Sequence, residues 1–333
     1  MQYRTLGTTN VRVSAVGFGG WVLGTSWYGT LDRTAGRALV RRALDLGITF
    51  FDTANSYGEA GVSETLLADA LAGVPRDAYV LGTKVGYDLE APRQHAHGER
   101  PHRWDGPFLR RSLEEGLGRL RTDAVDLLEL HNPRMDAVDS DDCFATLEAL
   151  KREGLVRSYG VALGPAIGWE EEGVSALRRR RVDAVQTVYS VLEQDPGRAF
   201  LREAEAVGAS VLARVPHASG ALEGTVTKET VYPAGDHRSF RNRQMLHDLL
   251  DKAETIAFLW QGGERSVAQA AMQFCLQQPR IASVLPTATT IGQLEEFAAA
   301  ADLPAISDAQ LLQVAALYDQ NFGVPRREYA KSH

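Results

Sequence analysis

The stretch FDTANSYG, residues 51–58, places an acid, Asp52, five positions before a phenol, Tyr57. The apolar run that leads into it, residues 48–51, is typical of a buried strand, so we expect Asp52 at the carboxyl end of that strand and Tyr57 on the loop that follows. An acid and a phenol at this spacing are suited to proton transfer. A buried capping aspartate and a packing tyrosine would have the same spacing, and the rest of the sequence decides between the two interpretations.

Apolar, β-branched runs recur along the chain and alternate with segments of helical spacing. The predicted strands are residues 14–19, 49–53, 79–85, 124–131, 158–163, 184–189, 210–215 and 282–286. The predicted helices are residues 34–46, 63–72, 108–120, 143–153, 171–180, 197–207 and 267–276. Repeated strand-then-helix units in one chain indicate an α/β protein, a parallel (β/α)8 TIM barrel.

Three further features complete the predicted architecture. Residues 3–14 carry a turn signal at 7–10 between two alternating runs, which predicts an N-terminal β-hairpin. The polar stretch 223–243 is long for a connection and predicts an extended loop on the C-terminal face, of a kind often associated with function. No linker divides the chain, so residues 1–333 are expected to form a single barrel domain.

Charge and cysteine content narrow the class of protein. The 333 residues carry a formal net charge of −7, with a pI near 5.7, which argues against nucleic acid or an anionic membrane as the main partner. Cys143 and Cys275 lie far apart in apolar, helical contexts and are expected to be reduced thiols. The N-terminus lacks the apolar region of a signal peptide, and no apolar run reaches the length of a membrane span, so we expect a cytoplasmic protein. The oligomeric state is left open.

A barrel places its chemistry at the carboxyl ends of the strands. Lys84 stands near the end of the third predicted strand, and His131 ends the fourth. A lysine inside an apolar strand is costly unless its charge is paired, and Asp52 on the adjacent strand is the natural partner. Four ionisable groups, with Tyr57, therefore converge from three neighbouring strands.

The motifs DTANSYG, GTKVG, SLEEGLGRLRTDAVDLLELHNP and VDAVQTVYS follow one another in an order and spacing that resembles the aldo-keto reductase superfamily, from the hairpin to about residue 303. The resemblance implies an NAD(P)H-dependent oxidoreductase that reduces an aldehyde or ketone to the alcohol, with Asp52, Tyr57, Lys84 and His131 as its catalytic tetrad. Tyr57 would be the general acid, and the Lys84 ammonium would lower the pKa of the phenol. Asp52 would hold Lys84, and a neutral His131 would orient the carbonyl.

The resemblance also implies contacts to the nicotinamide, and here the sequence departs from the family pattern. Gln186 stands where the family binds the carboxamide with a glutamine, but Ala162 and Leu163 replace the usual Ser-Asn pair. Arg214 stands where an aromatic residue usually stacks on the ring. We expect it to contact the ring or the pyrophosphate, with a structural salt bridge as the alternative.

Two later segments match the parts of the family that hold the phosphates. The loop 219–222 has small residues that let backbone amides approach a pyrophosphate, and residues 284–297 resemble the adenosine-phosphate segment. Thr287 and Gln293 occupy positions where many NADPH-preferring relatives carry cations, so NADPH (as NADP) remains the first expectation and NAD a second. The predicted cofactor contacts are Gly20, Trp21, Asp52, Gln186, Arg214, Ser219, Gly220, Leu222, Pro286, Thr287, Thr289, Gln293 and Glu296.

Aromatic residues gather on the predicted loops after the first and third strands and suggest a substrate pocket, although each alone could be a core residue. The predicted substrate contacts are Trp21, Trp27, Tyr28, Tyr57, Tyr87, Trp104 and His131. The substrate would be a small carbonyl compound, such as a keto sugar or another polar natural product. The segment 236–238 could clamp the cofactor or form a solvated loop tip.

Two other function classes are kept open. The first is a cofactor-binding regulatory or slow-turnover protein of the same fold, as the family's channel-associated members are. The second, metal-dependent hydrolysis, lacks a paired His or carboxylate cluster at the strand ends, so no metal ligands are predicted.

Overall fold

Eight parallel strands form the centre of the molecule in the computed structural model, which describes residues 1–28, 31–92, 99–164 and 168–327. The strands are β3 (Phe18–Gly19), β4 (Phe50–Asp52), β5 (Val80–Val85), β6 (Val125–His131), β7 (Val156–Ala162), β8 (Ala184–Val188), β9 (Ser210–Arg214) and β10 (Ile281–Leu285). Each pairs with the next in chain order. The last strand returns to the first segment, because Gly17 N donates to Val284 O at 2.9 Å and Val284 N donates to Ala15 O at 2.8 Å. The predicted (β/α)8 TIM barrel is confirmed.

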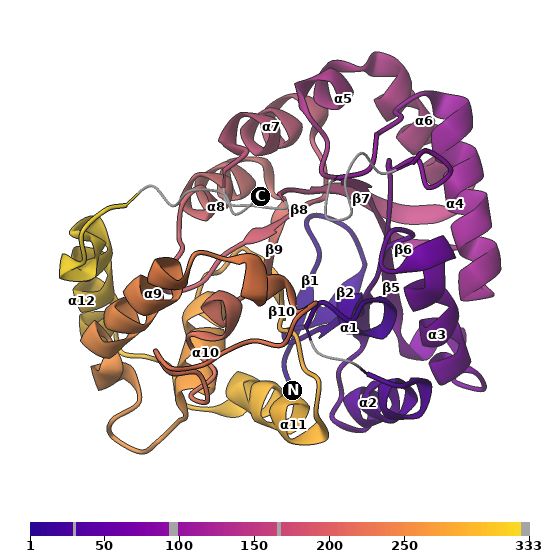
Figure 1. Cartoon of the computed structure of the whole chain (residues 1–333). Helices are drawn as coiled ribbons and strands as arrows, with labels where there is room; N and C mark the ends of the chain where they lie inside the picture. Colours follow the sequence, from indigo (N-terminus) through magenta and orange to yellow (C-terminus); the bar gives the residue numbers. More distant parts are fainter. Residues whose placement is uncertain (29–30, 93–98, 165–167, 328–333) are drawn as a thin grey trace.

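Helices surround the strands (Figure 1). The helices that follow the strands around the barrel are α2 (Arg33–Asp45), α3 (Val62–Leu71), α4 (Gly106–Leu120), α6 (Asp141–Arg152), α7 (Glu170–Ser175), α8 (Gly197–Val207), α10 (Val267–Leu276) and α11 (Ile291–Ala299). Side-chain caps explain several of their starts: Asp32, Asp105 and Ser140 accept from backbone N–H groups of α2, α4 and α6. The sequence predicted seven of these within a few residues, and the eighth, α11, begins in the segment 284–297 that resembles the family's adenosine-phosphate segment.

Four helices were not predicted: α1 (Trp21–Gly24), α5 (Met135–Asp139), α9 (Arg243–Thr255) and α12 (Asp308–Asp319). The first two are single turns, and α12 buries only Val314 completely. Helix α9 begins in a run of polar residues and buries Asp248, Leu249 and Ala253. The polar residues at its start continue the polar stretch that was predicted as a loop, and the apolar periodicity of α9 was overlooked.

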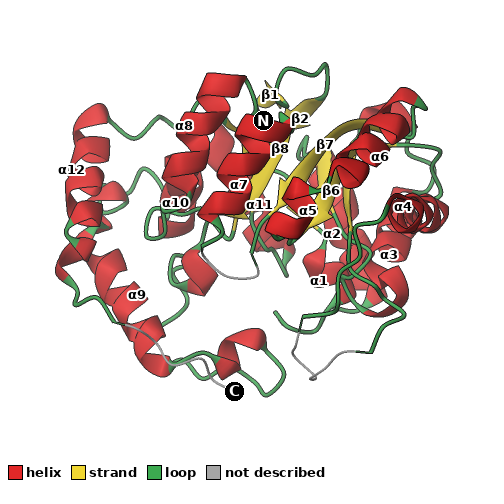
Figure 2. Cartoon of the chain, turned by 90° about the horizontal axis from the view of Figure 1, so that it is seen from above, coloured by secondary structure: helices red, strands yellow, loops and turns green. Residues whose placement is uncertain are grey.

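The N-terminal hairpin, β1 (Tyr3–Thr5) with β2 (Arg12–Ser14), fills one end of the barrel. Leu6, Val11 and Val13 are buried in a cluster with Phe50 and Leu127 from the barrel interior. The turn approaches the strand starts so closely that a Cβ on Gly7 would lie 2.7 Å from Asp183 O. The hairpin therefore closes the amino-terminal end, and Figure 2 shows the long loops at the opposite end.

The longest of these loops, residues 215–242, follows β9 and contains two short 3-10 helices, Ala218–Gly220 and His237–Phe240. It reaches across to the loop after β3, because both the backbone N–H and the Nδ1 atom of His237 lie 2.8 Å from Trp27 O. Among the described residues, no helix is both long and apolar enough to span a membrane.

Candidate active site

Asp52 and Lys84 form a buried ion pair at the centre of the barrel. Asp52 ends β4, and Lys84 lies on the neighbouring β5. The Lys84 ammonium donates to both Asp52 carboxylate oxygens, at 2.6 and 2.7 Å, and to Thr53 O at 2.8 Å. All three donors are used in short contacts, so the side chain has one fixed position.

Tyr57 and His131 lie above this pair. Lys84 Nζ is 5.0 Å from the centroid of the Tyr57 ring, and the rings of Tyr57 and His131 are 5.8 Å apart in an edge-on arrangement. Ser56 Oγ lies 3.2 Å from Nδ1 of His131, which leaves Nε2 for another partner. The structure therefore brings together all four residues of the predicted tetrad.

Burial controls the ionisation of these groups. Burial alone would lower the pKa of Lys84, but the Asp52 carboxylate more than compensates, so the pKa is raised and the amine stays charged. Burial, with the charges of Lys84 and Arg214, places the pKa of His131 well below its ordinary value, so the ring is neutral. Burial raises the pKa of Tyr57 more than Lys84 lowers it. The expectation that Lys84 would bring this pKa below its ordinary value is therefore wrong for this structure, although the direction of the Lys84 effect is right.

Glu129 is a second buried carboxylate that the sequence reading missed. It pairs in register with Lys84 across β5 and β6, and its Oε2 lies 3.8 Å from Nζ. Its Oε1 is buried and has no hydrogen-bond partner among the described residues. Burial, together with the Asp52 charge, raises the pKa of Glu129 to about 8 against the opposing effect of Lys84. The Glu in DLLELH, which faces inward two residues before His131, was the available signal.

Gln186 on β8 links the two carboxylates. Its Nε2 donates to Asp52 Oδ1 and to Glu129 Oε2, both at 3.0 Å. Because both amide hydrogens are used within the site, the group that remains for a ligand is the carbonyl oxygen Oε1.

A cavity of about 360 Å³ opens above the tetrad. The predicted residues that line it are Trp21, Trp27, Tyr28, Asp52, Tyr57, Tyr87, His131, Gln186, Arg214, Ser219 and Thr287. Arg214 donates to Leu163 O at 2.9 Å and makes no ion pair within the described part of the chain, so the salt-bridge alternative has no support here.

Ala162 and Leu163, which replace the expected Ser-Asn pair, differ in position. Ala162 lines the cavity. Leu163 is buried, and its side chain points toward α7, where a Cβ on Gly173 would lie 2.7 Å from Leu163 Cδ1. Only Ala162 therefore stands where a polar replacement could reach a ligand.

Other predicted residues do not line the cavity: Gly20, Trp104, Gly220, Leu222, Pro286, Thr289, Gln293 and Glu296. Trp104 stacks on His102, which in turn stacks on Tyr87, so it lies one ring behind the cavity wall. Gln293 Oε1 accepts from Thr289 N at 3.0 Å and from its hydroxyl at 3.1 Å, and Glu296 accepts from Ser266 Oγ. Roles for these residues toward a cofactor stay predictions.

The rim of the cavity contains polar residues that were not predicted. Glu99 accepts from the Tyr87 hydroxyl, and Asn132 Nδ2 donates to both Tyr87 Oη and Glu99 Oε1. Arg100 and His237 also line the cavity. The pocket is therefore aromatic on one part of its wall and hydrogen-bonding on another. Asn132 directly follows His131 and could have been found from the strand end, whereas Glu99 lies on a loop whose position no local pattern gives.

The loop after β9 turns sharply where it begins. Ala218, Ser219 and Gly220 have φ values of 47, 58 and 104° in succession. The backbone N–H groups of Ala218, Gly220 and Ala221 donate to Val215 O, His217 O and Ala218 O, so they are used within the turn. Ser219 is the residue of this turn that lines the cavity. A Cβ atom added at Gly220 would lie 3.3 Å from Arg238 Nη1.

The family model described as "Aldo/keto reductase family" matches residues 15–319, which covers the barrel and every residue of the site. The chain belongs to this family. Aldo-keto reductases are oxidoreductases that use nicotinamide cofactors, which agrees with the cavity above the tetrad.

Curated relatives cover nearly the whole chain. It is 29% identical to L-galactose dehydrogenase of Arabidopsis thaliana over 313 residues, 90% of this chain and 88% of that protein. It is 28% identical to NADH-specific methylglyoxal reductase of Escherichia coli (strain K12) over 317 residues, 91% and 94% of the two chains. The holo form of aldo-keto reductase AKR11C1 from Bacillus halodurans superposes with a TM-score of 0.77 at 27% identity, over 95% of this chain and 96% of that chain.

Proposed function

We propose that the protein is an NAD(P)H-dependent reductase of a small, polar aldehyde or ketone, with Tyr57 as the general acid. The observation that carries the proposal is the buried Asp52–Lys84 pair directly below Tyr57, with a neutral His131 beside it. A lysine this deeply buried is costly to maintain, and its ammonium lies 5.0 Å from the centroid of the Tyr57 ring, which lines the cavity.

The residues present fit a dinucleotide. The cavity extends from Asp52 and Gln186 past Arg214 to Ser219 and Thr287, so one elongated ligand can contact both the tetrad and the loop after β9. Gln186 would accept a hydrogen bond from the carboxamide through Oε1, and Ser219, which lines the cavity at the start of the loop after β9, would contact the pyrophosphate. When bound, the reduced nicotinamide supplies a hydride to the carbonyl carbon.

The protein's own groups handle the proton. The Tyr57 hydroxyl donates its proton to the carbonyl oxygen as charge develops there, and the Lys84 ammonium stabilises the resulting phenolate. Asp52 keeps Lys84 charged and in place. A Ser56 hydroxyl that donates to Nδ1 of His131 leaves the ring proton on Nε2, which can donate to the same carbonyl oxygen and orient it.

The polar rim supports the substrate class. Glu99 and Asn132 offer hydrogen-bond acceptors in a cavity that is also lined by the aromatic residues Trp21 and Trp27. Hydroxylated carbonyl compounds present both donors and apolar C–H faces, and one curated relative is named for a sugar, L-galactose.

A Tyr57→Phe variant tests the assignment. It should reduce turnover of NADPH or NADH with a carbonyl panel by a factor of at least about 10³, in the range that loss of general acid catalysis costs. Cofactor binding, followed by tryptophan fluorescence, should change little. Tyr3→Phe is the matched control, because Tyr3 lies on the hairpin and donates only to Gly47 O. Normal turnover by Tyr57→Phe would refute the role.

A further inference from the structure

Glu129 lies between the catalytic groups and the apolar core of the barrel. Residues two positions apart on a strand face the same side, and Leu127, two residues before Glu129 on β6, belongs to the buried cluster that the hairpin closes. Phe50 and Leu212 are members of the same cluster. On the other side of Glu129, Lys84 Nζ lies 3.8 Å from its Oε2. The Glu129 side chain has no exposed surface, so apolar groups and charged groups, rather than bulk water, determine its ionisation.

Glu129 receives few hydrogen bonds for a buried acid. The Lys84 ammonium uses its three N–H groups on the two Asp52 oxygens and on Thr53 O, so it has no further donor for Glu129. Gln186 Nε2 donates to Glu129 Oε2 at 3.0 Å. Oε1 is buried and has no hydrogen-bond partner among the residues that the structure describes. A buried carboxylate with a single donor is costly, and a proton on Oε1 removes the charge without disturbing the contact with Gln186.

The proton on Glu129 decides the charge balance beneath the cavity. The neighbouring strands contribute Asp52 from β4, Lys84 from β5 and Arg214 from β9, whereas Gly160, which pairs with Glu129 on β7, has no side chain. His131, at the end of β6, is neutral because of its lowered pKa. Two cations therefore face one other carboxylate. With Glu129 protonated, this set has one positive charge in excess, and with Glu129 ionised the charges balance.

Tyr57 is the group that responds to this balance. Its ring centroid lies 5.0 Å from Lys84 Nζ. Burial has the largest effect on the pKa of Tyr57 and raises it, the charges of Lys84 and Arg214 lower it, and the charge of Asp52 raises it. When Tyr57 gives up its proton, negative charge appears on its oxygen, and an excess of positive charge nearby stabilises that product. An ionised Glu129 would remove the excess.

We propose that Glu129 is a positioning residue that carries a proton in the active form of the enzyme, and that loss of this proton slows carbonyl reduction by opposing formation of the Tyr57 phenolate beside Lys84. The inference rests on the proposed function, in which Tyr57 is the general acid. The proton that reaches the carbonyl oxygen comes from Tyr57. Glu129 keeps its own proton throughout the transfer and does not contact the substrate.

The pH range of the effect is set by Glu129. Its pKa, raised by burial and by the charge of Asp52 against the effect of Lys84, is about 8. Burial lowers the pKa of the cavity histidines His131, His217 and His237 and raises that of Tyr57, so these groups ionise outside the range in which Glu129 changes charge.

The pH dependence of kcat tests the coupling. The rate of reduction of the carbonyl compound that the wild type reduces fastest would be measured at saturating cofactor, from about pH 6.5 to about pH 9.5, in the wild type, Glu129→Gln and Glu129→Asp. Glu171→Gln, on the exposed part of α7, is the matched control for loss of one carboxyl group. Thermal unfolding of each variant confirms that it is folded.

The wild type and Glu171→Gln should lose kcat by about tenfold across this range, with little change in the KM for the carbonyl compound. Glu129→Gln should change by less than about twofold and stay near the wild-type kcat at the lowest pH. Glu129→Asp, which retains a carboxyl group, should restore a decrease with pH. The same decrease in Glu129→Gln as in the wild type would overturn the inference. A low kcat of Glu129→Gln at every pH would also overturn it, because that result indicates a role in packing alone.

Infrared difference spectra between the wild type and Glu129→Gln observe the proton without turnover. The carbonyl band of a protonated carboxyl group should be present at about pH 6.5 and absent at about pH 9.5, and its absence at the lower pH would contradict the inference. Normal turnover by Tyr57→Phe would instead refute the proposed function. The infrared band separates the two failures, because it reports the proton on Glu129 whatever the rate of turnover.

Discussion

The carboxylate of Glu129 lies 3.8 Å from the ammonium of Lys84, and neither side chain has any exposed surface. Lys84 therefore has two acidic neighbours, since Asp52 contacts it directly. One ammonium cannot fully compensate two buried carboxylates, and the pKa of about 8 for Glu129 means that this residue holds a proton near neutral pH.

This arrangement predicts an unusual pH dependence of stability. An acid that ionises near pH 4.5 when unfolded, but only near pH 8 when folded, stabilises the protein below pH 4.5, and the contribution is lost as the pH rises to about 8. Glu129→Gln, which cannot ionise, should therefore gain stability relative to wild type between pH 5 and 8, by on the order of a few kcal/mol, and the gain should level off above pH 8. Urea unfolding at pH 5 to 9 measures this, with the exposed Glu171→Gln as control. A difference that is flat with pH would contradict the protonated state of Glu129.

Asp52 and Lys84 should respond differently to removal. Lys84→Met leaves Asp52 as an uncompensated buried charge and should cost about 3–5 kcal/mol of stability. Asp52→Asn leaves Lys84 with Glu129 and Thr53 O as partners and should cost about 1–3 kcal/mol. Turnover should also fall less for Asp52→Asn than for Tyr57→Phe. Chemical unfolding measures the loss of stability, and kcat measures the loss of turnover. A larger loss of stability for Asp52→Asn than for Lys84→Met would contradict the prediction.

Ala162 and Leu163, which replace the expected Ser-Asn pair, should respond differently to substitution by polar residues. Ala162→Ser places a hydroxyl at the cavity wall and should tighten nicotinamide cofactor binding by up to about tenfold. Leu163→Asn puts an amide into the apolar contact with Gly173 and should instead lower stability by about 1–3 kcal/mol without a gain in affinity. Fluorescence titration and thermal unfolding separate the two effects. Equal affinity gains from both variants would show that residue 163 reaches the ligand after all.

Cofactor preference should respond to Thr287 but not to Gln293. Thr287 lines the cavity, so Thr287→Lys should tighten NADPH relative to NADH by about tenfold through one added charge-assisted hydrogen bond. Gln293→Arg removes the acceptor for Thr289 N at the start of α11 and should cost about 1 kcal/mol of stability. The ratio of the two dissociation constants is the measurement. An unchanged ratio for Thr287→Lys would indicate that the 2′-phosphate is bound elsewhere.

The fold was predictable because alternating apolar runs and helical segments are local signals repeated many times, and the tetrad because each member sits at a strand end. The predicted and observed boundaries of the elements differ where residues contribute to the closure of the barrel rather than to a single strand. Ser14 belongs to the hairpin and residues 15–17 to the closing bridge, so the first strand is shorter than its apolar run. The short π-helical segment Ala176–Arg180 continues α7 within a stretch predicted as uniform helix.

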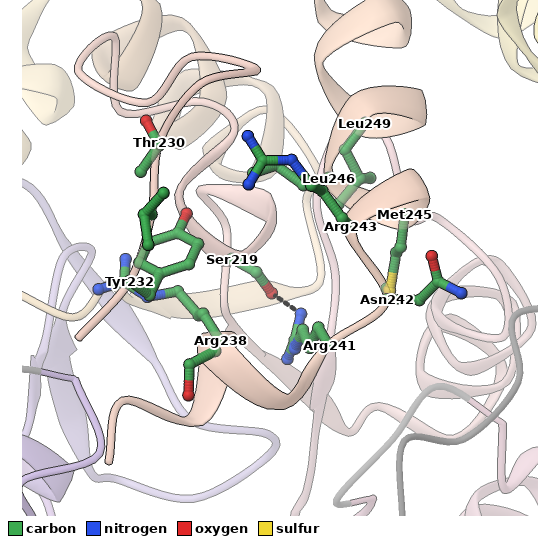
Figure 3. Close-up of a pocket in the computed structure, with 12 residues that line it drawn as sticks. Ser219, Thr230, Tyr232, Arg238, Arg241, Asn242, Arg243, Met245, Leu246 and Leu249 are labelled. Atoms are coloured by element: carbon green, nitrogen blue, oxygen red, sulfur yellow. Dashed lines mark hydrogen bonds between the residues drawn. The ribbon is translucent and has the colours of Figure 1, made fainter. Parts of the chain in front are cut away.

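The site was less predictable away from the strands. Gln186 and Arg214 follow from their register on β8 and β9, whereas Glu99, Arg100 and His237 reach the cavity from loops whose course depends on contacts with distant segments. The Arg241–Ser219 contact joins residues from the two ends of one long loop (Figure 3), and no periodicity in the sequence encodes such a pairing. Glu129 lies within a predicted strand, but the sequence does not distinguish it from the other residues of that buried run. Its role becomes evident from its distance of 3.8 Å to Lys84 Nζ.

The hairpin that fills the amino-terminal end of the barrel also sets the order of events in a catalytic cycle. With Leu6, Val11 and Val13 buried against the barrel interior, ligands approach Tyr57 from the C-terminal face. The cofactor and the carbonyl substrate therefore enter and leave through the same face of the barrel. The one that lies deeper must bind first and dissociate last. We expect product inhibition patterns typical of an ordered mechanism. In such a mechanism, dissociation and rebinding of the deeper ligand limit how fast the next catalytic cycle begins.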